Sequence, residues 1–271
     1  MENPLLLRKK IIEETKQKVA EAYSRKDLHI IKAVMLLDDL DKQFNLLAEQ
    51  AREWYGMHFP ELNRAVQDNE TFLKLISIGE RKEFNASKIL KYFKNKEKAK
   101  ELEERAKKSM GAGIEKEDLK QIQLLAETAL GLKKLREIFS SYIEKSMKSL
   151  LPNFSELASP LIAARLLAKA GSTKRLAFMP SSTMQIIGAE KALFKHLRAK
   201  AKPPKHGLIF SHSLLRDMPK KQRGKIARSL AGKLSIAART DYFGKKKIAP
   251  ELKKELDERA AELKGELKSA K

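Results

Sequence analysis

The sequence predicts an all-α protein, elongated and built mainly from long helices. Apolar residues recur at gaps of three and four along extended stretches, as they do on one face of an α-helix. The composition combines 34% charged with only 6% aromatic residues, which suits extended helices better than one large core. We expect a coiled-coil hairpin followed by a compact helical domain. The expected parts are entry helices over 1–70, the hairpin over 71–150, the compact domain over 151–243 and a basic charged tail over 244–271.

Cysteine usage and hydropathy narrow the class further. The chain contains no cysteine, which excludes a disulfide framework and a thiolate metal site and fits a reducing compartment. The longest apolar runs fall far short of the roughly 18 residues that a membrane span requires, and no signal-peptide pattern opens the chain. We therefore expect a cytoplasmic protein without a membrane partner.

Two helices are predicted in the first part of the chain, over 5–23 and 28–56, with Asp27 as the N-cap of the second. The second helix carries apolar residues at helical gaps, the pattern of a packing seam. Three nearby aspartates in this helix lack the loop geometry of a cation site, so no metal is predicted there. The seam residues are Ile30, Val34, Leu37, Leu40, Phe44, Leu47, Ala51 and Trp54.

Aromatic residues at the end of this helix are interpreted as structural. Trp54 and Phe44 follow the seam periodicity, so we expect both in the core. His58 is likewise interpreted as a structural residue rather than a ligand.

The hairpin is predicted from a first arm near 87–110, a turn at Gly111-Ala112-Gly113 and a second arm that opens with acidic residues. Apolar residues of the second arm follow a spacing close to a heptad. The first arm is too polar to cover this seam, which favours self-association, although a monomeric antiparallel hairpin remains the alternative. The residues expected at the dimer seam are Ile122, Leu125, Ala129, Leu132, Leu135 and Phe139.

The compact domain is expected to begin with an apolar stretch over 154–170 that Gly171 ends. A further helix is predicted from Ser182 as N-cap to about Arg198. Gly188 interrupts it at a cost of about 1 kcal/mol relative to alanine. We interpret Gly188 as a point where another chain or an RNA backbone approaches closely, with simple helix packing as the alternative.

Charge is concentrated in this part of the chain. Residues 161–250 hold 21 lysines and arginines against three acids, a balance of +18 out of the total of +22. The remaining residues hold 36 basic and 32 acidic residues. A field this one-sided attracts polyanions, so we expect the functional surface here.

A helix beginning near Pro219 organises the predicted surface. Its apolar stripe contains Ile226, Leu230, Leu234 and Ala237. The opposite stripe is cationic and almost free of acids, which favours phosphate contact over a merely solvated face and gives affinity with little base discrimination. We expect no aromatic platform for unpaired bases beside it. The polar stripe contains Lys221, Lys225, Arg228, Ser235 and Arg239.

Catalytic chemistry is poorly supported in the basic region. Its acids, Glu190, Asp217 and Asp241, are far apart in sequence, so they do not predict a two-metal site. Its three histidines, at 196, 206 and 212, lack a nucleophile or a paired acid. No phosphate-binding or dinucleotide loop follows a strand. We expect a non-enzymatic protein without a cofactor, and a histidine-dependent RNA-processing enzyme is the alternative of another class.

Three motifs in order carry a resemblance. Gly188–Phe194 reads GAEKALF, Lys202–Ile209 reads KPPKHGLI and Gln222–Arg228 reads QRGKIAR. Together they resemble the Nop domain, and Arg52–Leu62 is also similar to a signature of that family. The chain resembles, from about Asp27 to Phe243, the Nop-family scaffold of archaeal box C/D guide-RNA particles, which methylate RNA at the ribose 2′-oxygen. A spliceosomal Nop-domain scaffold is the nearest alternative.

The resemblance implies a homodimer formed through the coiled coil. It also implies binding of a box C/D guide RNA at a kink-turn, together with the small protein that binds the kink-turn first, inside an archaeal cell. Full-length relatives recruit the methyltransferase fibrillarin through a preceding domain that we expect this chain to lack, so fibrillarin is expected as a partner of full-length relatives rather than of this chain. Lys195 stands where the family motif often has arginine, which keeps the charge but loses a planar bidentate group. The residues expected to contact RNA are Gly188, Ala189, Glu190, Lys191, Lys195, His196, Arg198, Lys202, Lys205, His206, His212, Lys221, Arg223, Lys225, Arg228 and Arg239.

Overall fold

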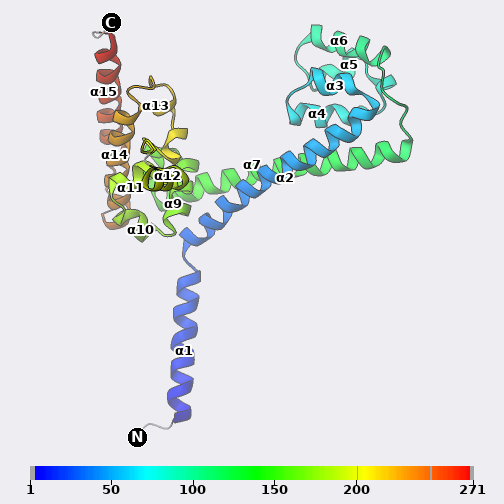
Figure 1. Cartoon of the computed structure of the whole chain (residues 1–271). Coiled ribbons are helices and arrows are strands. Elements are labelled where there is room, and N and C mark those ends of the chain that lie inside the picture. Colours follow the sequence, from blue (N-terminus) through cyan, green and yellow to red (C-terminus); the bar gives the residue numbers. More distant parts are fainter. Residues whose placement is uncertain (1–3, 200, 245, 269–271) are drawn as a thin grey trace. The chain divides into compact units, whose positions relative to one another are not determined.

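The computed structural model describes residues 4–199, 201–244 and 246–268. Over these residues the protein is helical and contains no strand, which confirms the predicted all-α class (Figure 1). None of the described helices combines the length and the apolar character that a membrane crossing requires. The helices are α1 (Pro4–Tyr23), α2 (Lys26–His58), α3 (Pro60–Ala65), α4 (Asn69–Ile76), η1 (Arg81–Glu83), α5 (Ala86–Leu90), α6 (Lys96–Lys107), α7 (Lys116–Leu150), α8 (Pro152–Ala158), α9 (Pro160–Ala170), α10 (Thr173–Phe178), α11 (Ser181–Ile186), α12 (Glu190–Ala199), η2 (Leu208–Ser211), α13 (Ser213–Arg216), α14 (Arg223–Phe243) and α15 (Ala249–Lys268).

The chain forms two compact units. One contains Leu36–Phe139, and the other contains Met1–Met35 together with Ser140–Lys271. This division differs from the expected one, because residues 36–70 belong with the segment expected to form the hairpin rather than to a separate N-terminal part. The physical reason is the partner that α7 uses, which periodicity in the sequence does not reveal.

Within the unit Leu36–Phe139, α7 packs against α2. Arg136 Nε donates to Asp41 Oδ1 over 2.5 Å, and the Lys133 ammonium lies 5.5 Å from the centre of the Phe44 ring. Buried residues of both helices also enter one core cluster. The expected first arm of the hairpin, near 87–110, is divided into two helices, α5 and α6.

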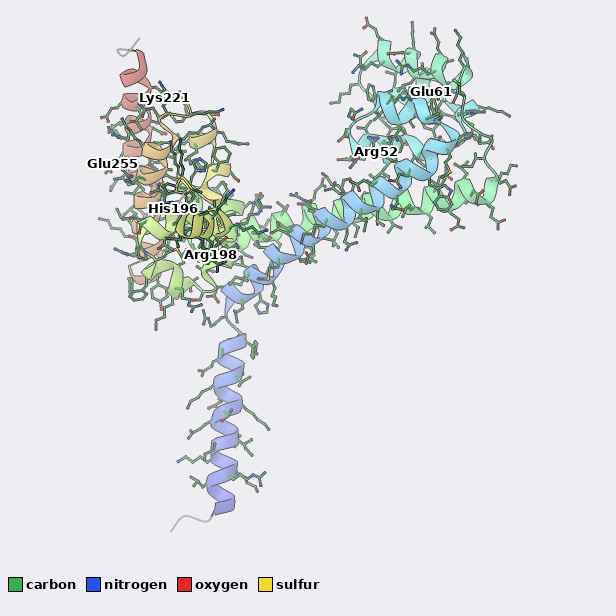
Figure 2. All side chains as sticks on the ribbon, in the orientation of Figure 1. Arg52, Glu61, His196, Arg198, Lys221 and Glu255 are labelled. Carbon is green, nitrogen blue, oxygen red and sulfur yellow. The ribbon has the colours of Figure 1, made fainter. Side chains whose placement is uncertain are left out.

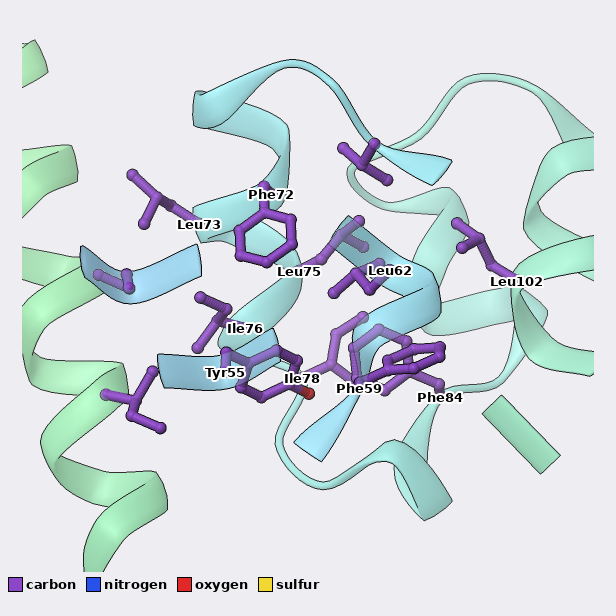
Figure 3. Packing of buried hydrophobic residues seen from close by; sticks show 14 of the residues in the cluster. Tyr55, Phe59, Leu62, Phe72, Leu73, Leu75, Ile76, Ile78, Phe84 and Leu102 are labelled. Atoms are coloured by element: carbon purple, nitrogen blue, oxygen red, sulfur yellow. The ribbon is translucent and has the colours of Figure 1, made fainter. Parts of the chain in front are cut away.

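The same unit buries aromatic rings in its core (Figure 3). Tyr55, Phe59 and Phe72 have no exposed surface and Phe84 is 2% exposed. Phe59 and Phe84 meet edge to face with their ring centres 5.3 Å apart, a geometry that aromatic quadrupoles favour. The Tyr55 hydroxyl donates to Gly79 O over 2.7 Å, and burial raises the pKa of this phenol. The core therefore has defined ring contacts as well as apolar area.

The position of Trp54 corrects a prediction. Trp54 is 39% exposed, whereas Ala51 and Tyr55 are buried. The buried face advances by four residues from Ala51 to Tyr55 rather than by three to Trp54, because a helix of 3.6 residues per turn needs both steps to keep one face toward the core. Phe44 is partly buried against the core, as expected for a seam residue.

The predicted Gly-Ala-Gly turn is the link between α6 and α7. Ala112 N donates to Met57 O over 3.0 Å. The His58 ring lies against Ala112 O at 2.8 Å and accepts from Arg81 N at 3.0 Å, which confirms its structural role. A Cβ at Gly111 would collide with the carbonyl of His58, so the turn requires glycine there. Burial is the main cause of the lowered pKa of His58.

Near the turn, two charged side chains fix loops by hydrogen bonds (Figure 2). Glu61 accepts from the Ser109 hydroxyl at 2.6 Å and from Met110 N at 3.1 Å. Arg52 donates to Asn63 and Asn69 and stacks over the Phe72 ring at 4.3 Å. The Arg52–Leu62 signature noted in the sequence therefore has a structural function in this unit.

In the second unit, α14 is the central helix, with α8, α10, α11 and α15 packed against it (Figure 1). Residues expected to form a charged tail instead form α15. Its apolar residues recur at helical gaps and are buried, which explains why the segment folds. Gly171, with φ of +83°, ends α9 as predicted. The buried residues of α15 are Ala249, Leu252, Leu256, Ala260 and Leu263.

Two buried carboxylates join helices in this unit. Asp27 accepts from Thr173 N over 2.9 Å and pairs with Arg25 at 2.6 Å. It therefore serves the first turn of α10, whereas the predicted role was the N-cap of α2, a helix that begins at Lys26. Asp241 accepts from the backbone N–H groups of Asn153 and Phe154, at the start of α8.

Candidate nucleic-acid interface

The basic surface is built around a turn that crosses the end of α11. Gly207 N donates to Gln185 O over 2.9 Å, and Leu208 N donates to Ile187 O over 2.8 Å. The Gln185 amide donates to Lys205 O over 2.7 Å. A Cβ at Gly207 would collide with the Ile187 carbonyl. Backbone hydrogen bonds therefore hold the second of the three Nop-like motifs against the end of α11, directly before the first motif.

Gly188 divides the helix that was predicted from 182 to 198. It has φ of +89°, a conformation that glycine adopts without steric cost, and the chain leaves α11 here and begins α12 at Glu190. A Cβ at Gly188 would lie 2.5 Å from Leu208 Cγ. The side chain that lies close to Gly188 is therefore Leu208 of the same chain. This corresponds to the alternative of helix packing rather than to the approach of another chain or of RNA.

Glu190 stabilises the break between α11 and α12 through contacts within the protein. Its Oε1 accepts from Gly188 N over 3.0 Å and lies 3.5 Å from Lys169 Nζ. Partial burial opposes its ionisation, but hydrogen bonds from its own N–H and from Gly188, together with Lys169, outweigh burial and lower its pKa. The acid of the GAEK sequence thus remains ionised and stabilises the turn.

A stack of three side chains follows the turn. The His206 ring lies parallel to Phe210, with ring centres 4.5 Å apart and an interplanar angle of 12°. The Arg223 guanidinium lies 5.4 Å from the centre of the Phe210 ring and donates to Met218 O over 2.8 Å. Burial, and then the charge of Arg223, lower the pKa of His206, so its ring is neutral at pH 7. Lys205 lies beside Gly224, which brings the second and third motifs together.

The ring nitrogens of two further histidines, His212 and His196, contact backbone atoms of the protein itself. His212 Nδ1 accepts from Leu214 N at 3.3 Å and Nε2 lies 2.9 Å from Leu157 O, so the neutral ring with a proton on Nε2 satisfies both contacts. Burial lowers the pKa of His212. His196 Nδ1 contacts Ala201 O. His212 is therefore a structural residue in this fold, and neither ring has a catalytic partner in these contacts.

The apolar stripe predicted for the central helix is confirmed. Ile226, Leu230, Leu234 and Ala237 are fully buried. Ser235, expected on the cationic stripe, is 5% exposed and donates to Met179 O over 3.1 Å. Ser235 faces inward because the buried side of α14 is broad enough to include the residue after Leu234. Small residues line this side of the helix.

The structure divides the predicted cations between two places. Lys225 and Arg228 are exposed near the start of α14, Lys221 precedes that helix, and Arg239 is exposed toward its far end. From Arg223 to Arg239 the helix advances about 24 Å at about 1.5 Å per residue. Arg239 Nε donates to Ala177 O over 3.2 Å. It therefore does not join the cations at the start of α14.

The remaining predicted contacts lie on α12 and the following turn. Lys191, Lys195 and Arg198 are exposed, and α12 contains no buried residue. Lys202 and Lys205 are also exposed, whereas Ala189 is half-buried. Figure 2 labels His196 and Arg198 on α12 and Lys221 ahead of α14. We call the exposed cations of α12, the 202–207 turn and the first half of α14 the basic face.

The predicted dimer seam is used partly inside the chain. Ile122 and Ala129 have no exposed surface and belong to the core of the unit Leu36–Phe139. Leu125, Leu132 and Phe139 are half-buried, and Leu135 is 39% exposed. The exposed apolar residues of α7 are Leu124, Leu135 and Ile138.

An exposed aromatic cluster beside Arg239 was missed by the sequence reasoning. Phe178 and Phe243 meet edge to face with ring centres 5.6 Å apart, and Tyr242 meets Phe243 at 4.8 Å. The expectation that the basic region lacks an aromatic platform is therefore wrong. The signal available was the pair of adjacent aromatic residues at the end of the basic helix, but its partner Phe178 is 65 positions earlier in the chain.

Metal chemistry has no evident position in this surface. Among the described residues, no group of three or more histidines, aspartates or glutamates has the proximity that a metal ion requires. The acids of the basic region instead make structural hydrogen bonds, as Glu190 and Asp241 illustrate.

Comparisons with known proteins agree with this architecture. The family model described as "Nop: snoRNA binding domain, fibrillarin" matches residues 36–262. An uncharacterized NOP5 family protein of Methanocaldococcus jannaschii is 45% identical over 252 residues, which are 92% of this chain and 60% of that protein. Nucleolar protein 58 of Sclerotinia sclerotiorum is 43% identical over 216 residues, which are 79% of this chain and 38% of that protein.

A solved structure is also similar. The crystal structure of a fibrillarin/NOP5p complex contains a chain that matches with a TM-score of 0.51 and 27% sequence identity, over 95% of this chain and 78% of that one. The present chain spans less than two thirds of the length of the two relatives described above. The family model nevertheless covers most of the chain, and the chain therefore belongs to the Nop family.

Proposed function

We propose that this chain is a non-catalytic scaffold of a box C/D RNA-guided 2′-O-methylation ribonucleoprotein. In this proposal the basic face binds a kink-turn of the guide RNA together with the protein that recognises the kink-turn first. Membership of a family described as a snoRNA-binding domain supports the RNA partner. The similar chain in a fibrillarin/NOP5p complex supports the methyltransferase as a further partner.

The observation that carries the proposal is the charge of the basic face. Residues 161–250 contain 21 basic and three acidic residues, and two of those acids are engaged in the hydrogen bonds of α8 and of the Gly188 break. Lysines and arginines on α12, the 202–207 turn and α14 are exposed. A concave pocket with catalytic groups is not needed for such a surface, because phosphate binding depends mainly on positive charge.

The geometry of the motifs supports composite recognition. The 202–207 turn is fastened to α11, and Arg223 is fastened over Phe210. The elements that carry the exposed cations are therefore held together, yet phosphate contacts carry little sequence information. A partner protein that holds the kinked RNA would remove the cost of ordering it. We therefore expect tighter binding to the RNA–protein complex than to free RNA.

Gel-shift titrations of the whole chain test this proposal. The targets are a kink-turn RNA alone, the same RNA bound by its primary protein, and an RNA of equal length without the kink-turn. Preferential binding to the RNA–protein complex supports the proposal, and equal affinity for all three targets would contradict it. Lys191→Glu with Lys195→Glu should weaken binding to the complex, because both lysines are exposed on α12.

Gly188 is a poor position for this test. Leucine there would clash with Leu208 and would also take a strained backbone conformation, since φ is +89°. Such a variant would damage the turn and lose binding for a structural reason. The exposed lysines of α12 avoid that ambiguity.

Self-association is a further part of the proposal. Part of the predicted seam on α7 packs against α2 within the unit, so the surface available for a second copy is the exposed row Leu124, Leu135 and Ile138. These residues share a helix face at spacings of 11 and 3. We propose this row, extended by the half-buried Leu132, as the dimer contact.

Recruitment of fibrillarin can be tested separately. Co-purification of the chain with the methyltransferase would place the contact within these 271 residues. Failure to co-purify, with RNA binding intact, would assign that contact to a part of longer relatives that this chain does not match.

A further inference from the structure

The aromatic residues at the far end of α14 form a surface distinct from the basic face. Phe178 is 61% exposed, Phe243 is 64% exposed and Tyr242 is 39% exposed. Their edge-to-face contacts hold the rings near one another while much of each phenylalanine remains in contact with solvent. We call these three residues the aromatic platform.

The exposed phenylalanines of the protein are confined to its basic segment. The four exposed phenylalanines are Phe178, Phe194, Phe210 and Phe243, and all of them lie within the basic segment 161–250. The other seven phenylalanines are buried or half-buried. A contiguous patch of exposed rings marks an interaction site, so the coincidence of the aromatic platform with surplus positive charge points to a ligand that has both planar rings and negative charge.

The platform has a cation one helical turn before each phenylalanine. Lys174 precedes Phe178 on α10, and Arg239 precedes Phe243 on α14, each by four residues, a spacing that places side chains next to each other. Both cations are exposed, and among the residues that the structure describes neither forms an ion pair with an acid. Arg239 also joins the two helices, because its Nε donates to Ala177 O beside Phe178.

We propose that the aromatic platform binds unpaired nucleotides of RNA, with bases stacked on Phe178 and Phe243 and the sugar-phosphate backbone near Lys174 and Arg239. Bases stack on aromatic side chains in a way that tolerates different sequences, and neighbouring cations follow the backbone. A paired duplex hides its base faces and cannot use the rings. The platform therefore selects single-stranded RNA, whereas the basic face selects charge.

This inference rests on RNA as the partner of the proposed function but assigns a second site on it. Arg223 and Arg239 are about 24 Å apart along α14 at about 1.5 Å per residue. One RNA could reach both sites if unpaired nucleotides continue from the structured element on the basic face.

Fluorescence anisotropy of the full chain with a labelled oligouridylate, and with a labelled RNA duplex of equal length, tests the platform. Phe178→Ala with Phe243→Ala should weaken oligouridylate binding by roughly ten- to a hundredfold, from the loss of one or two stacked bases. Duplex binding should remain within about twofold of the parent, because the cations remain. Circular dichroism should show unchanged helix content, since both rings are exposed.

Substitution chemistry separates stacking from simple apolar contact. Phe243→Tyr should retain oligouridylate affinity, whereas Phe243→Leu should lose it, because only the former keeps a ring. Tyr92→Ala is the matched control, since Tyr92 is 39% exposed in the other unit. It should leave the affinity unchanged.

Failure of the stacking proposal and failure of the proposed function would give different experimental results. Parent affinity of the Phe178→Ala, Phe243→Ala variant for oligouridylate, or equal losses on oligouridylate and duplex, would overturn the stacking proposal. Loss of kink-turn protein binding or of self-association, with oligouridylate affinity retained, would overturn it in favour of a protein contact. Lys225→Glu with Arg228→Glu that left kink-turn binding intact would instead contradict the basic face and leave the platform result standing.

Discussion

The two units of the protein use aromatic residues in opposite ways. The unit Leu36–Phe139 buries Tyr55, Phe59, Phe72 and Phe84 together, and its charges nearly balance, with 20 basic and 19 acidic residues over 36–139. The segment 161–250 exposes four phenylalanines and holds 21 basic residues against three acids. The first region buries or half-buries its phenylalanines and nearly balances its charges, whereas the second exposes phenylalanines together with surplus positive charge.

The cores of the two regions explain how this difference arises. Around α14 the core combines aliphatic side chains such as Leu230 and Leu234 with small ones such as Ala231 and Ala238. Only one phenylalanine of the second unit, Phe154, is fully buried. Aliphatic and alanine side chains therefore fill most of this core, and four of the five phenylalanines of the second unit are exposed.

The largest expected effect comes from removing a ring in the aromatic core. Phe59→Ala should lower the free energy of unfolding by about 3–5 kcal/mol, because it leaves a cavity beside Phe84. Phe243→Ala should change it by less than about 1 kcal/mol, since that ring is 64% exposed. Urea unfolding followed by circular dichroism reports both units, and tryptophan fluorescence separates the first unit, because Trp54 is the single tryptophan. Equal shifts for both variants would contradict the contrast between the two regions.

The next largest effect concerns self-association through the unit Leu36–Phe139. Leu135→Lys with Ile138→Lys would place two charges in the proposed contact between copies, and each buried charge costs more than the roughly 1–3 kcal/mol of an unpaired neutral polar group. We expect a dimer for the parent and a monomer for the variant by multi-angle light scattering. Lys120→Glu changes the charge of α7 at an exposed position and should keep the dimer. A monomeric parent would remove the basis of this proposal.

The charge of the second region gives a smaller, salt-dependent effect. Lys225→Glu with Arg228→Glu should weaken binding of kink-turn RNA and reduce the slope of log affinity against log salt by up to about two, at about 0.9 per phosphate contact. Lys94→Glu with Lys98→Glu makes the same charge change at exposed positions of the other unit and should alter the slope little. Filter-binding titrations at several salt concentrations measure both. Equal slopes for the two variants would show that only net charge matters.

Local periodicity predicted much of the fold. The first two helices were expected over 5–23 and 28–56 and are observed over Pro4–Tyr23 and Lys26–His58. Gly171 and the buried stripe of α14 also followed from local pattern. These features depend on residues within one or two turns, which the sequence displays directly.

Features that depend on distant residues were not predictable in the same way. Periodicity marks an apolar face of α7 but does not reveal that α2 covers part of it. The break at Gly188 depends on Leu208, and the role of His212 depends on Leu157. The aromatic platform joins Phe178 to Phe243. In each case the decisive contact lies between elements whose sequence pattern carries no record of the pairing.

Two buried carboxylates extend the comparison inside the second unit. Asp27 and Asp241 are 2% and 7% exposed, and each accepts backbone N–H groups at the start of a helix. Burial by itself would raise the pKa of either carboxyl. At Asp27 the hydrogen bonds from Arg25 and Thr173 and the charge of Arg25 outweigh burial, so the pKa is lowered. At Asp241 burial prevails over the hydrogen bonds from Phe154 and Asn153, and its pKa is raised. The presence of one arginine decides the sign.

The smallest expected effect is a difference in pH dependence between these carboxylates. A lowered pKa means that Asp27 contributes stability above its unfolded pKa of about 3.9, which is lost as pH falls through the lower folded pKa. A raised pKa means that the contribution of Asp241 is present below about pH 3.9 and is lost as pH rises through its folded pKa. Asp27→Asn should therefore cost about 1 kcal/mol at neutral pH and little in acid, whereas Asp241→Asn should cost most in acid. Thermal unfolding followed by circular dichroism between pH 3 and 7 measures both, and parallel profiles for the two variants would contradict the role assigned to Arg25.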